Sequence, residues 1–302
     1  MPKAMTSESG TGLSGSVGHD AAGRGPVETP SGKDAAYENF PVGSWLLPAA
    51  LRPHIAVFYA FARAIDDIAD NPDLAADEKV RRLDGFEAAL LGRDMDDPAY
   101  GTAHTMRESL GKTGVPVAHC VDLISAFKLD ATKLRYRDWD DLMGYCILSA
   151  APVGRYLVDL HGGSADGHGP SDALCNALQV INHLQDCKDD YKTLDRVYLP
   201  GAWMAEAGVE VEELAKDSAS VGMRRVLDRC LDETSALMVE AKALPGGLKS
   251  RRLAMESAAI IEIAERLIDS LRNGDPLGPR RIHLTKPGYF WCCAKGVVRA
   301  LF

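Results

Sequence analysis

Residues 61–70 read FARAIDDIAD and residues 179–190 read QVINHLQDCKDD, and these two stretches decide how the rest of the chain is interpreted. Each stretch contains two aspartates four positions apart. The two pairs are Asp66 with Asp70 and Asp186 with Asp190. Side chains at this spacing lie one turn apart on the same face of a helix. Because apolar residues flank both pairs, each stretch predicts a largely buried helix that carries one carboxylate pair.

Helical periodicity extends outward from these stretches over most of the chain. Apolar residues recur at alternating spacings of three and four at Ile55, Phe58, Ala62, Ile65 and Ala69. Similar patterns cover residues 78–91, 103–111, 117–131, 138–161, 171–193, 218–243 and 252–272. Glycine and proline separate them, and no convincing run alternates as a half-buried strand does. The sequence therefore predicts an all-α, single-domain helical bundle, with the carboxylate pairs facing each other across a central cavity.

Composition restricts the class of protein. The chain has 302 residues, 46% of them apolar, and a net charge of −9. This acidic balance argues against a nucleic-acid partner, which would need a basic face. No stretch approaches the roughly 20 apolar residues of a membrane-spanning helix. Seven scattered cysteines without a C-x-x-C pair are typical of a reducing compartment, so we expect a cytoplasmic protein. The sequence does not determine the oligomeric state.

Three segments are expected along the chain: 1–35, 36–285 and 286–302. The first is rich in Gly, Ser, Ala and Thr, which predicts a disordered tail. Its stretch at residues 10–15 fits G-x-G-x-x-G, but no strand precedes it, so a dinucleotide site is not expected. The second segment is the helical domain. The third combines basic and aromatic residues, which fits either a terminal helix docked on the domain or peripheral contact with the inner membrane.

The two carboxylate pairs favour a site for hard divalent cations. Mg²⁺ prefers carboxylate oxygens and keeps positions open for phosphate oxygens. The second stretch also carries Gln179 and Asn182 on the same face as its aspartates, and such a polar stripe is costly unless its groups have partners. We therefore take four aspartates as candidate Mg²⁺ ligands; the alternative is a set of solvent-facing carboxylates. They are Asp66, Asp70, Asp186 and Asp190. Without an H-E-x-x-H motif, zinc is not expected.

Five motifs in the same order resemble those of the squalene/phytoene synthases, the head-to-head branch of the isoprenoid synthases. They are LLP at 46–48 followed by Arg52, YAFAR at 59–63 with Asp66 to Asp70, YC at 145–146 before SAAPVG at 149–154, the stretch 179–190, and DRVYLP at 195–200. This resemblance implies an α-helical isoprenoid-synthase fold. It also implies Mg²⁺ as cofactor and a prenyl diphosphate substrate, whose leaving group the metal neutralises.

Three stretches most resemble the hopanoid-pathway branch of this family: 38–44, 130–136 and 149–154. The resemblance implies conversion of presqualene diphosphate and water to hydroxysqualene and diphosphate, a carbon–oxygen lyase reaction. Gln185 stands where phytoene-type enzymes usually carry arginine, which favours a site for one diphosphate. One alternative is a prenyltransferase that condenses two prenyl diphosphates to presqualene diphosphate or phytoene. Another is a non-catalytic isoprenoid-binding scaffold.

Spacing and the resemblance together assign roles to single residues. Tyr145 matches the family tyrosine near the reacting carbons, where its ring could stabilise a cation and its hydroxyl could steer a water or proton. Tyr145 and the four aspartates form the predicted catalytic set. The residues expected to bind substrate are Phe40, Tyr59, Arg63, Lys133, Arg135, Gln179, Asn182 and Arg196. The alternative for the basic residues is a surface charge or an ion pair. The alternative for Gln179 and Asn182 is a buried amide that pairs with the backbone, and for the aromatic residues it is a position in the core.

Overall fold

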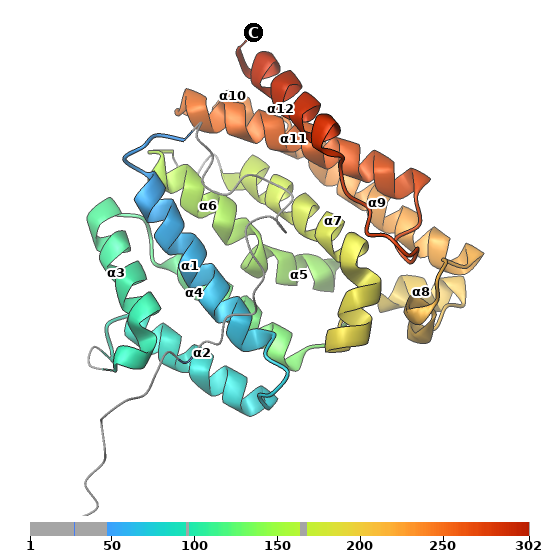
Figure 1. Ribbon diagram of the computed structural model, residues 1–302, viewed down its shortest axis with the longest axis horizontal. Coiled ribbons are helices and arrows are strands. Elements are labelled where there is room, and N and C mark those ends of the chain that lie inside the picture. The colour runs from blue at the N-terminus through green and yellow to red at the C-terminus, as the bar shows by residue number, and fades with distance from the viewer. Residues whose placement is uncertain (1–26, 28–46, 95–96, 164–167, 302) are drawn as a thin grey trace, which may run out of the picture.

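The computed structural model describes residue 27 and residues 47–94, 97–163 and 168–301 (Figure 1). The α-helices are α1 Arg52–Ala69, α2 Ala76–Leu90, α3 Gly101–Thr113, α4 Ala118–Thr132, α5 Trp139–Ser149, α6 Ala151–Leu160, α7 His168–Leu194, α8 Gly201–Ala207, α9 Val221–Ala241, α10 Leu244–Gly247, α11 Arg251–Asn273 and α12 Lys286–Leu301. The 3₁₀ helices are η2 Pro98–Tyr100 and η4 Val211–Ala215. The strands are β1 Arg135–Tyr136 and β2 Val197–Pro200. Phe40 and the glycine-rich motif at 10–15 lie outside the described residues.

The predicted helix at 138–161 is two helices, and that part of the sequence interpretation is corrected. The helices α5 and α6 meet at Ala150, which lies between Ser149 and Ala151. Pro152 occupies the first turn of α6, where an amide hydrogen has no intrahelical acceptor and the proline ring is tolerated. The apolar pattern continues through the junction, so periodicity alone did not reveal the break.

A two-stranded parallel sheet, which the sequence did not predict, joins two distant parts of the chain. Arg135 of β1 pairs with Val197 of β2. The two strands contain two and four residues, too few for an alternating pattern to be recognised. Their pairing brings the chain that follows α7 against the chain that follows α4. It thereby places Arg196 and Tyr198 beside Asp130 of α4.

The long helix α7 lies at the centre of the bundle, between α1 and α6 on one side and α9 and α11 on the other (Figure 1). Apolar residues form two core clusters. One is built mainly from α5, α7, α9 and α11. The other is built mainly from α1 to α4 and α6. Phe58 of the second cluster and Leu174 of the first line one shared cavity, so this cavity lies where the two clusters meet.

The C-terminal segment forms α12, which is docked on α11. Gly296 permits the close approach, because a Cβ atom at this position would lie 2.5 Å from the backbone oxygen of Ala258. Lys295 and Arg299 form ion pairs of 2.7 and 3.1 Å with Glu262, a buried residue of α11. Within the described parts of the chain, no helix is both long and apolar enough to span a membrane.

Candidate active site

The shared cavity has a volume of about 260 Å³ and a mostly apolar lining from α1, α5, α6, α7 and α11. Ala62 of α1 and Asn182 of α7 line it from opposite helices. Asp66 follows Ala62 by one helical turn, and Asp186 follows Asn182 by one turn. The two aspartate pairs therefore continue the cavity-facing sides of their helices beyond the lining residues, and their role as metal ligands stays a prediction.

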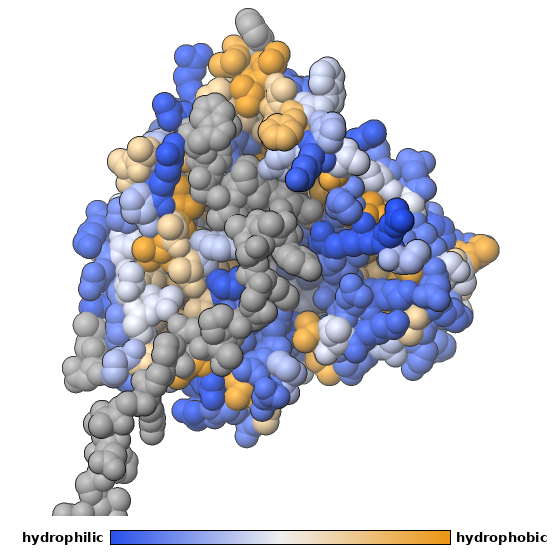
Figure 2. Space-filling model, viewed as in Figure 1, coloured by the Kyte–Doolittle hydropathy of each residue, from blue (hydrophilic) through white to orange (hydrophobic). Residues whose placement is uncertain are grey.

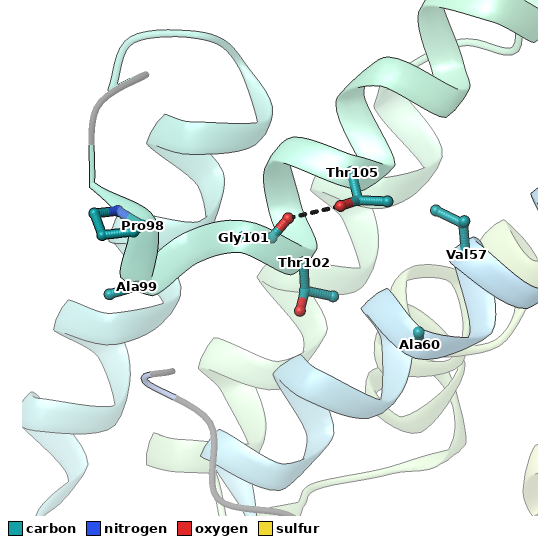
Figure 3. A pocket seen from close by; sticks show the side chains of 7 residues that line it. All are labelled: Val57, Ala60, Pro98, Ala99, Gly101, Thr102 and Thr105. Carbon is teal, nitrogen blue, oxygen red and sulfur yellow. Dashed lines mark hydrogen bonds between the residues drawn. The ribbon is translucent and has the colours of Figure 1, made fainter. Parts of the chain in front are cut away.

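Small residues at the α5–α6 junction make room for the cavity. Ser149, Ala150 and Gly154 all line it. A Cβ atom on Gly154 would lie 2.3 Å from the Ser171 hydroxyl oxygen, so a larger residue here would force the Ser171 side chain to move. A second hollow lies between α1 and α3 (Figure 3), and the seven described residues that line it carry no charge. The first cavity combines an apolar wall with the two helices that carry the aspartate pairs.

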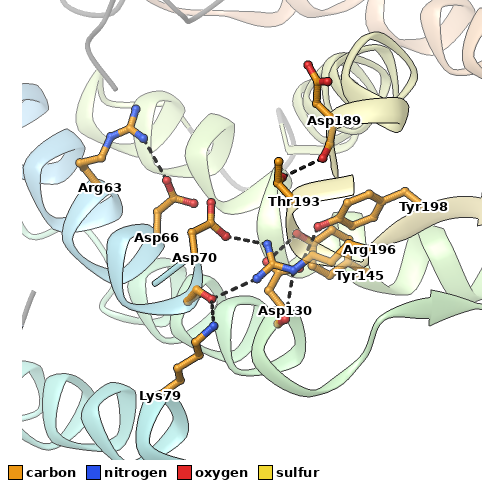
Figure 4. Close-up of polar contacts among 11 residues, drawn as sticks. Arg63, Asp66, Asp70, Lys79, Asp130, Tyr145, Asp189, Thr193, Arg196 and Tyr198 are labelled. Atoms are coloured by element: carbon orange, nitrogen blue, oxygen red, sulfur yellow. Dashed lines mark hydrogen bonds and ion pairs between the residues drawn. The ribbon is translucent and has the colours of Figure 1, made fainter. Parts of the chain in front are cut away.

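Arginine side chains accompany the first aspartate pair (Figure 4). Arg63 donates to Asp66 at 2.9 Å and to the Tyr59 hydroxyl at 3.2 Å. Arg196 donates to Asp70 at 2.6 Å across 126 positions of sequence. The structure thus places three predicted substrate-binding residues at this motif, two of them in ion pairs with the predicted metal ligands.

An arginine that the sequence analysis missed accompanies the second pair. Arg281, from the segment between α11 and α12, binds both carboxylate oxygens of Asp186, one of them at 2.9 Å. Gln185 is buried and donates to the backbone oxygen of Ile282 in the same segment. The absence of arginine at position 185 therefore does not leave Asp186 without a guanidinium group. The expectation of a site for one diphosphate stays a prediction.

Arg196 links the first motif to a buried polar network. Besides Asp70, its guanidinium donates to the backbone oxygens of Ala69 at 3.1 Å and Asp130 at 3.2 Å. Lys79 also donates to the Ala69 oxygen, at 2.8 Å. Two cationic side chains thus meet the C-terminal end of α1, where the helix dipole is negative. No local motif marks Lys79, because its partner lies ten positions away on another helix.

Asp130 is the acceptor at the centre of this network. It receives hydrogen bonds from the hydroxyls of Tyr145 at 2.8 Å and Tyr198 at 3.1 Å. Burial raises the pKa of Asp130 to about 6, although the Arg196 charge opposes the shift. Burial also holds the Tyr145 pKa well above its usual range, so the phenol stays protonated as the donor. Tyr145 is not among the described residues that line the cavity, and its hydroxyl donates to Asp130; its catalytic role stays a prediction.

His183 of α7 belongs to the same region. Its ring stacks on Tyr198 with centroids 3.5 Å apart, and its Nε2 lies 3.2 Å from the Gln179 amide nitrogen. Burial lowers the pKa of His183 to about 3, so the ring is neutral near pH 7 and can accept from the amide. Its position four residues after Gln179 was the signal that could have identified it.

Charges from both motifs act on this network. Burial is the main cause that raises the pKa of Tyr198, and the negative charges of Asp130 and Asp190 add to it. Asp70 likewise adds to the raised pKa of Asp130. The charges of Asp70 on α1 and Asp190 on α7 therefore both act on one set of hydrogen-bonded groups.

Two predicted substrate contacts lie in ion pairs outside the cavity lining. Lys133 pairs with Asp141 at 2.7 Å and lies over the Tyr136 ring. Arg135 pairs with Asp195 at 2.6 Å. Gln179 and Asn182, in contrast, line the cavity directly. Contact of Lys133, Arg135 and Phe40 with substrate stays a prediction.

Fold and site together define a class of protein: an all-α bundle in which two Asp-x-x-x-Asp helices border one apolar cavity, the arrangement of an isoprenoid synthase. The chain belongs to the squalene/phytoene synthase family, whose sequence pattern matches residues 34–287. It is 42% identical over 271 residues to the hydroxysqualene synthase of Rhodopseudomonas palustris, covering 90% of this chain and 91% of that protein. It is 30% identical to the phytoene synthase of Thermus thermophilus, covering 81% and 83%. The squalene synthase HpnC of Alicyclobacillus acidocaldarius has a similar structure, with a TM-score of 0.71, 31% identity and coverage of 81% and 91%.

Proposed function

We propose that this enzyme converts presqualene diphosphate and water to hydroxysqualene and diphosphate. The observation that carries the proposal is the 42% identity to a hydroxysqualene synthase over nine tenths of both chains, against 30% to a phytoene synthase. The reaction breaks the carbon–oxygen bond to diphosphate and forms one to water, so it is a lyase-type reaction rather than a prenyl transfer.

The aspartates fit Mg²⁺ as the cofactor of this reaction. Asp66, Asp70 and Asp186 offer only hard oxygen ligands, and each has a guanidinium within ion-pair distance. These arginines stand in for the positive charge that the carboxylates require. Together with Asp190 these carboxylates would hold Mg²⁺, which neutralises the leaving diphosphate when bound.

The chain's own residues supply the remaining requirements. Arg63, Arg196 and Arg281 present planar donors at the border of the cavity, a geometry suited to phosphate oxygens. The apolar wall excludes bulk water from a reactive carbocation. Ser149 lines this wall, and its hydroxyl has no hydrogen-bond partner among the residues that the structure describes. That hydroxyl can hold the single water that captures the cation.

Tyr145 acts as a positioning residue in this proposal. Its hydroxyl donates to Asp130, which also receives Tyr198. Arg196 donates to the Asp130 backbone and to the Asp70 carboxylate. The tyrosine thereby fixes the network that orients the first motif, and its ring packs 5.6 Å from that of Tyr198.

Product analysis by mass spectrometry tests the proposal. The purified protein receives Mg²⁺ and either presqualene diphosphate or farnesyl diphosphate alone, each with and without NADPH. We expect hydroxysqualene from presqualene diphosphate without NADPH. Accumulation of presqualene diphosphate or a longer condensation product would establish the prenyltransferase alternative. Substrate binding without any turnover, unchanged when Asp66 and Asp186 become Asn, would establish the scaffold alternative.

We also infer that α12 contacts a membrane surface, because its outer face is apolar. Phe290 and Trp291 are 72% and 71% exposed, and Val298 and Leu301 are also exposed. Figure 2 shows hydrophobic residues gathered at the end of the molecule where α12 ends. The double variant Phe290→Gln, Trp291→Gln tests this in sedimentation with anionic vesicles. Equal binding of the variant and the unmodified protein would contradict the inference. The cytoplasmic location stays a prediction.

A further inference from the structure

Three metal-ligating side chains meet at the end of α6, apart from the aspartate motifs. They are His119 near the start of α4, Asp159 in the last turn of α6 and His168 at the start of α7. The His119 Nε2 lies 2.7 Å from one oxygen of Asp159, and the His168 Nε2 lies 3.0 Å from the other. All three ligand atoms lie within 4.8 Å of one another. None of these residues lines the cavity.

We propose that this triad binds one Zn²⁺ ion. Two imidazoles with one carboxylate form a ligand set that suits zinc and similar borderline metals, whereas the oxygen-only aspartate motifs suit Mg²⁺. Tetrahedral coordination at about 2.0–2.2 Å places ligand atoms about 3.3 Å apart. The present separations are 2.7 Å from His119 to one oxygen of Asp159 and 3.0 Å from His168 to the other, so a bound ion requires the two imidazoles to move apart from the carboxylate and to share one metal.

Burial supports a bound ion with one open position. His119 is 6% exposed, so its ring is held in place by packing. The side chains of Asp159 and His168 retain 15% and 19% exposure, which admits solvent from one side. Three protein ligands and a water complete the four-coordinate arrangement typical of zinc.

The site would tie three helices together. Its ligands come from α4, α6 and α7, and both α6 and α7 also supply cavity wall through Gly154 and Ser171. Zinc binding is therefore expected to stabilise the folded chain, since a ligand that binds only the native state adds to its stability. The sequence could not reveal this set, because its members are 40 and 9 positions apart and follow no local zinc motif.

Metal titration of the full chain in excess Mg²⁺ tests the proposal, since Mg²⁺ then occupies the oxygen-only sites. The chelator-treated protein receives Co²⁺ for visible spectroscopy, or Zn²⁺ for elemental analysis and thermal unfolding. We expect one equivalent of retained Zn²⁺, the absorption of tetrahedral Co²⁺ and a raised melting temperature.

Three variants locate the ion. Asp159→Asn and His119→Gln should each weaken Zn²⁺ binding by more than the 10- to 100-fold typical of outer-shell substitutions, because each removes a direct ligand. His104→Gln, on α3 and bonded to the Asp97 backbone, is the matched control and should retain the ion. Failure of the unmodified protein to retain zinc would overturn the proposal and leave a hydrogen-bonded triad only. Equal binding by Asp159→Asn would do the same, and neither result bears on product formation.

Discussion

Replacing Arg196 by Met tests how the first aspartate motif is balanced electrostatically. Arg196 is 7% exposed and pairs with Asp70 at 2.6 Å. Removing one partner of a buried ion pair costs about 3–5 kcal/mol, because the other charge stays buried. This is a large part of the roughly 5–15 kcal/mol that stabilises a typical domain. We therefore expect the free energy of unfolding to fall by about 3–5 kcal/mol at pH 7.5 without Mg²⁺.

Arg63→Met is the matched control for this substitution. Arg63 also pairs with an aspartate of α1, but the side chains of Arg63 and Asp66 are 20% and 27% exposed. More solvent reaches this pair, so its removal should cost about 1 kcal/mol or less. Equal losses for the two variants would contradict the assigned difference in burial.

Mg²⁺ should reduce the deficit of Arg196→Met if Asp70 is a metal ligand. In the unmodified protein Asp70 must exchange Arg196 for the metal, whereas in the variant no guanidinium competes there. At a Mg²⁺ concentration of about 100 times its dissociation constant, binding stabilises the folded protein by about 2.7 kcal/mol. This applies to the unmodified protein or to the variant, whichever binds the ion. Urea unfolding followed by circular dichroism, with and without Mg²⁺, measures this difference. A deficit that is the same in both conditions would refute the assignment of Asp70 as a ligand.

Three further predictions concern the network and the cavity. The pKa of Asp130 is about 6 against 3.8 for the ordinary group, so its contribution to stability is present below pH 3.8 and lost as pH rises through 6. Relative to Asp130→Asn, the free energy of unfolding of the unmodified protein, measured with urea, should fall by up to about 3 kcal/mol over this pH range. If the unfolding free energies of the two proteins changed with pH in parallel, the prediction would be wrong. Gly154→Val should cost about 1–3 kcal/mol, because its Cβ would overlap Ser171, and should slow turnover; unchanged melting and rate would show that the helices can separate. Ser149→Ala should lower the share of hydroxylated product in mass spectrometry, and an unchanged share would exclude Ser149 as the water-holding group.

The sequence predicted those parts of the site that lie on single helices. The periodicity of α1 and α7 placed Asp66 with Asp70 and Asp186 with Asp190 on cavity-facing sides, because a helix fixes which positions share a face. Arg281 could not be found in this way. It reaches Asp186 across 95 positions, and only the packing of α11 and α12 against the bundle brings it there.

Pairing between distant segments also explains the other differences. The β1–β2 pair is too short to leave a pattern, yet it delivers Arg196 and Tyr198 to Asp130. The resemblance identified Tyr145 as a residue near the reaction, but it could not show that Asp130 accepts its hydroxyl hydrogen. Asp130 begins the stretch 130–136, but the sequence assigns it no role, since no local feature shows that two tyrosines donate to it.

The arginines explain how the folded protein tolerates so many carboxylates beside an apolar cavity. Like charges on one helix face repel, and their burial is costly unless each is compensated. Arg63, Arg196 and Arg281 supply that compensation, and two of them come from segments outside α1 and α7. Under the proposed function, these carboxylates would hold Mg²⁺, and the guanidinium groups paired with them now would be available to the oxygens of a substrate diphosphate. The same side chains would then serve in turn as counterions of the carboxylates and as ligands of the leaving group.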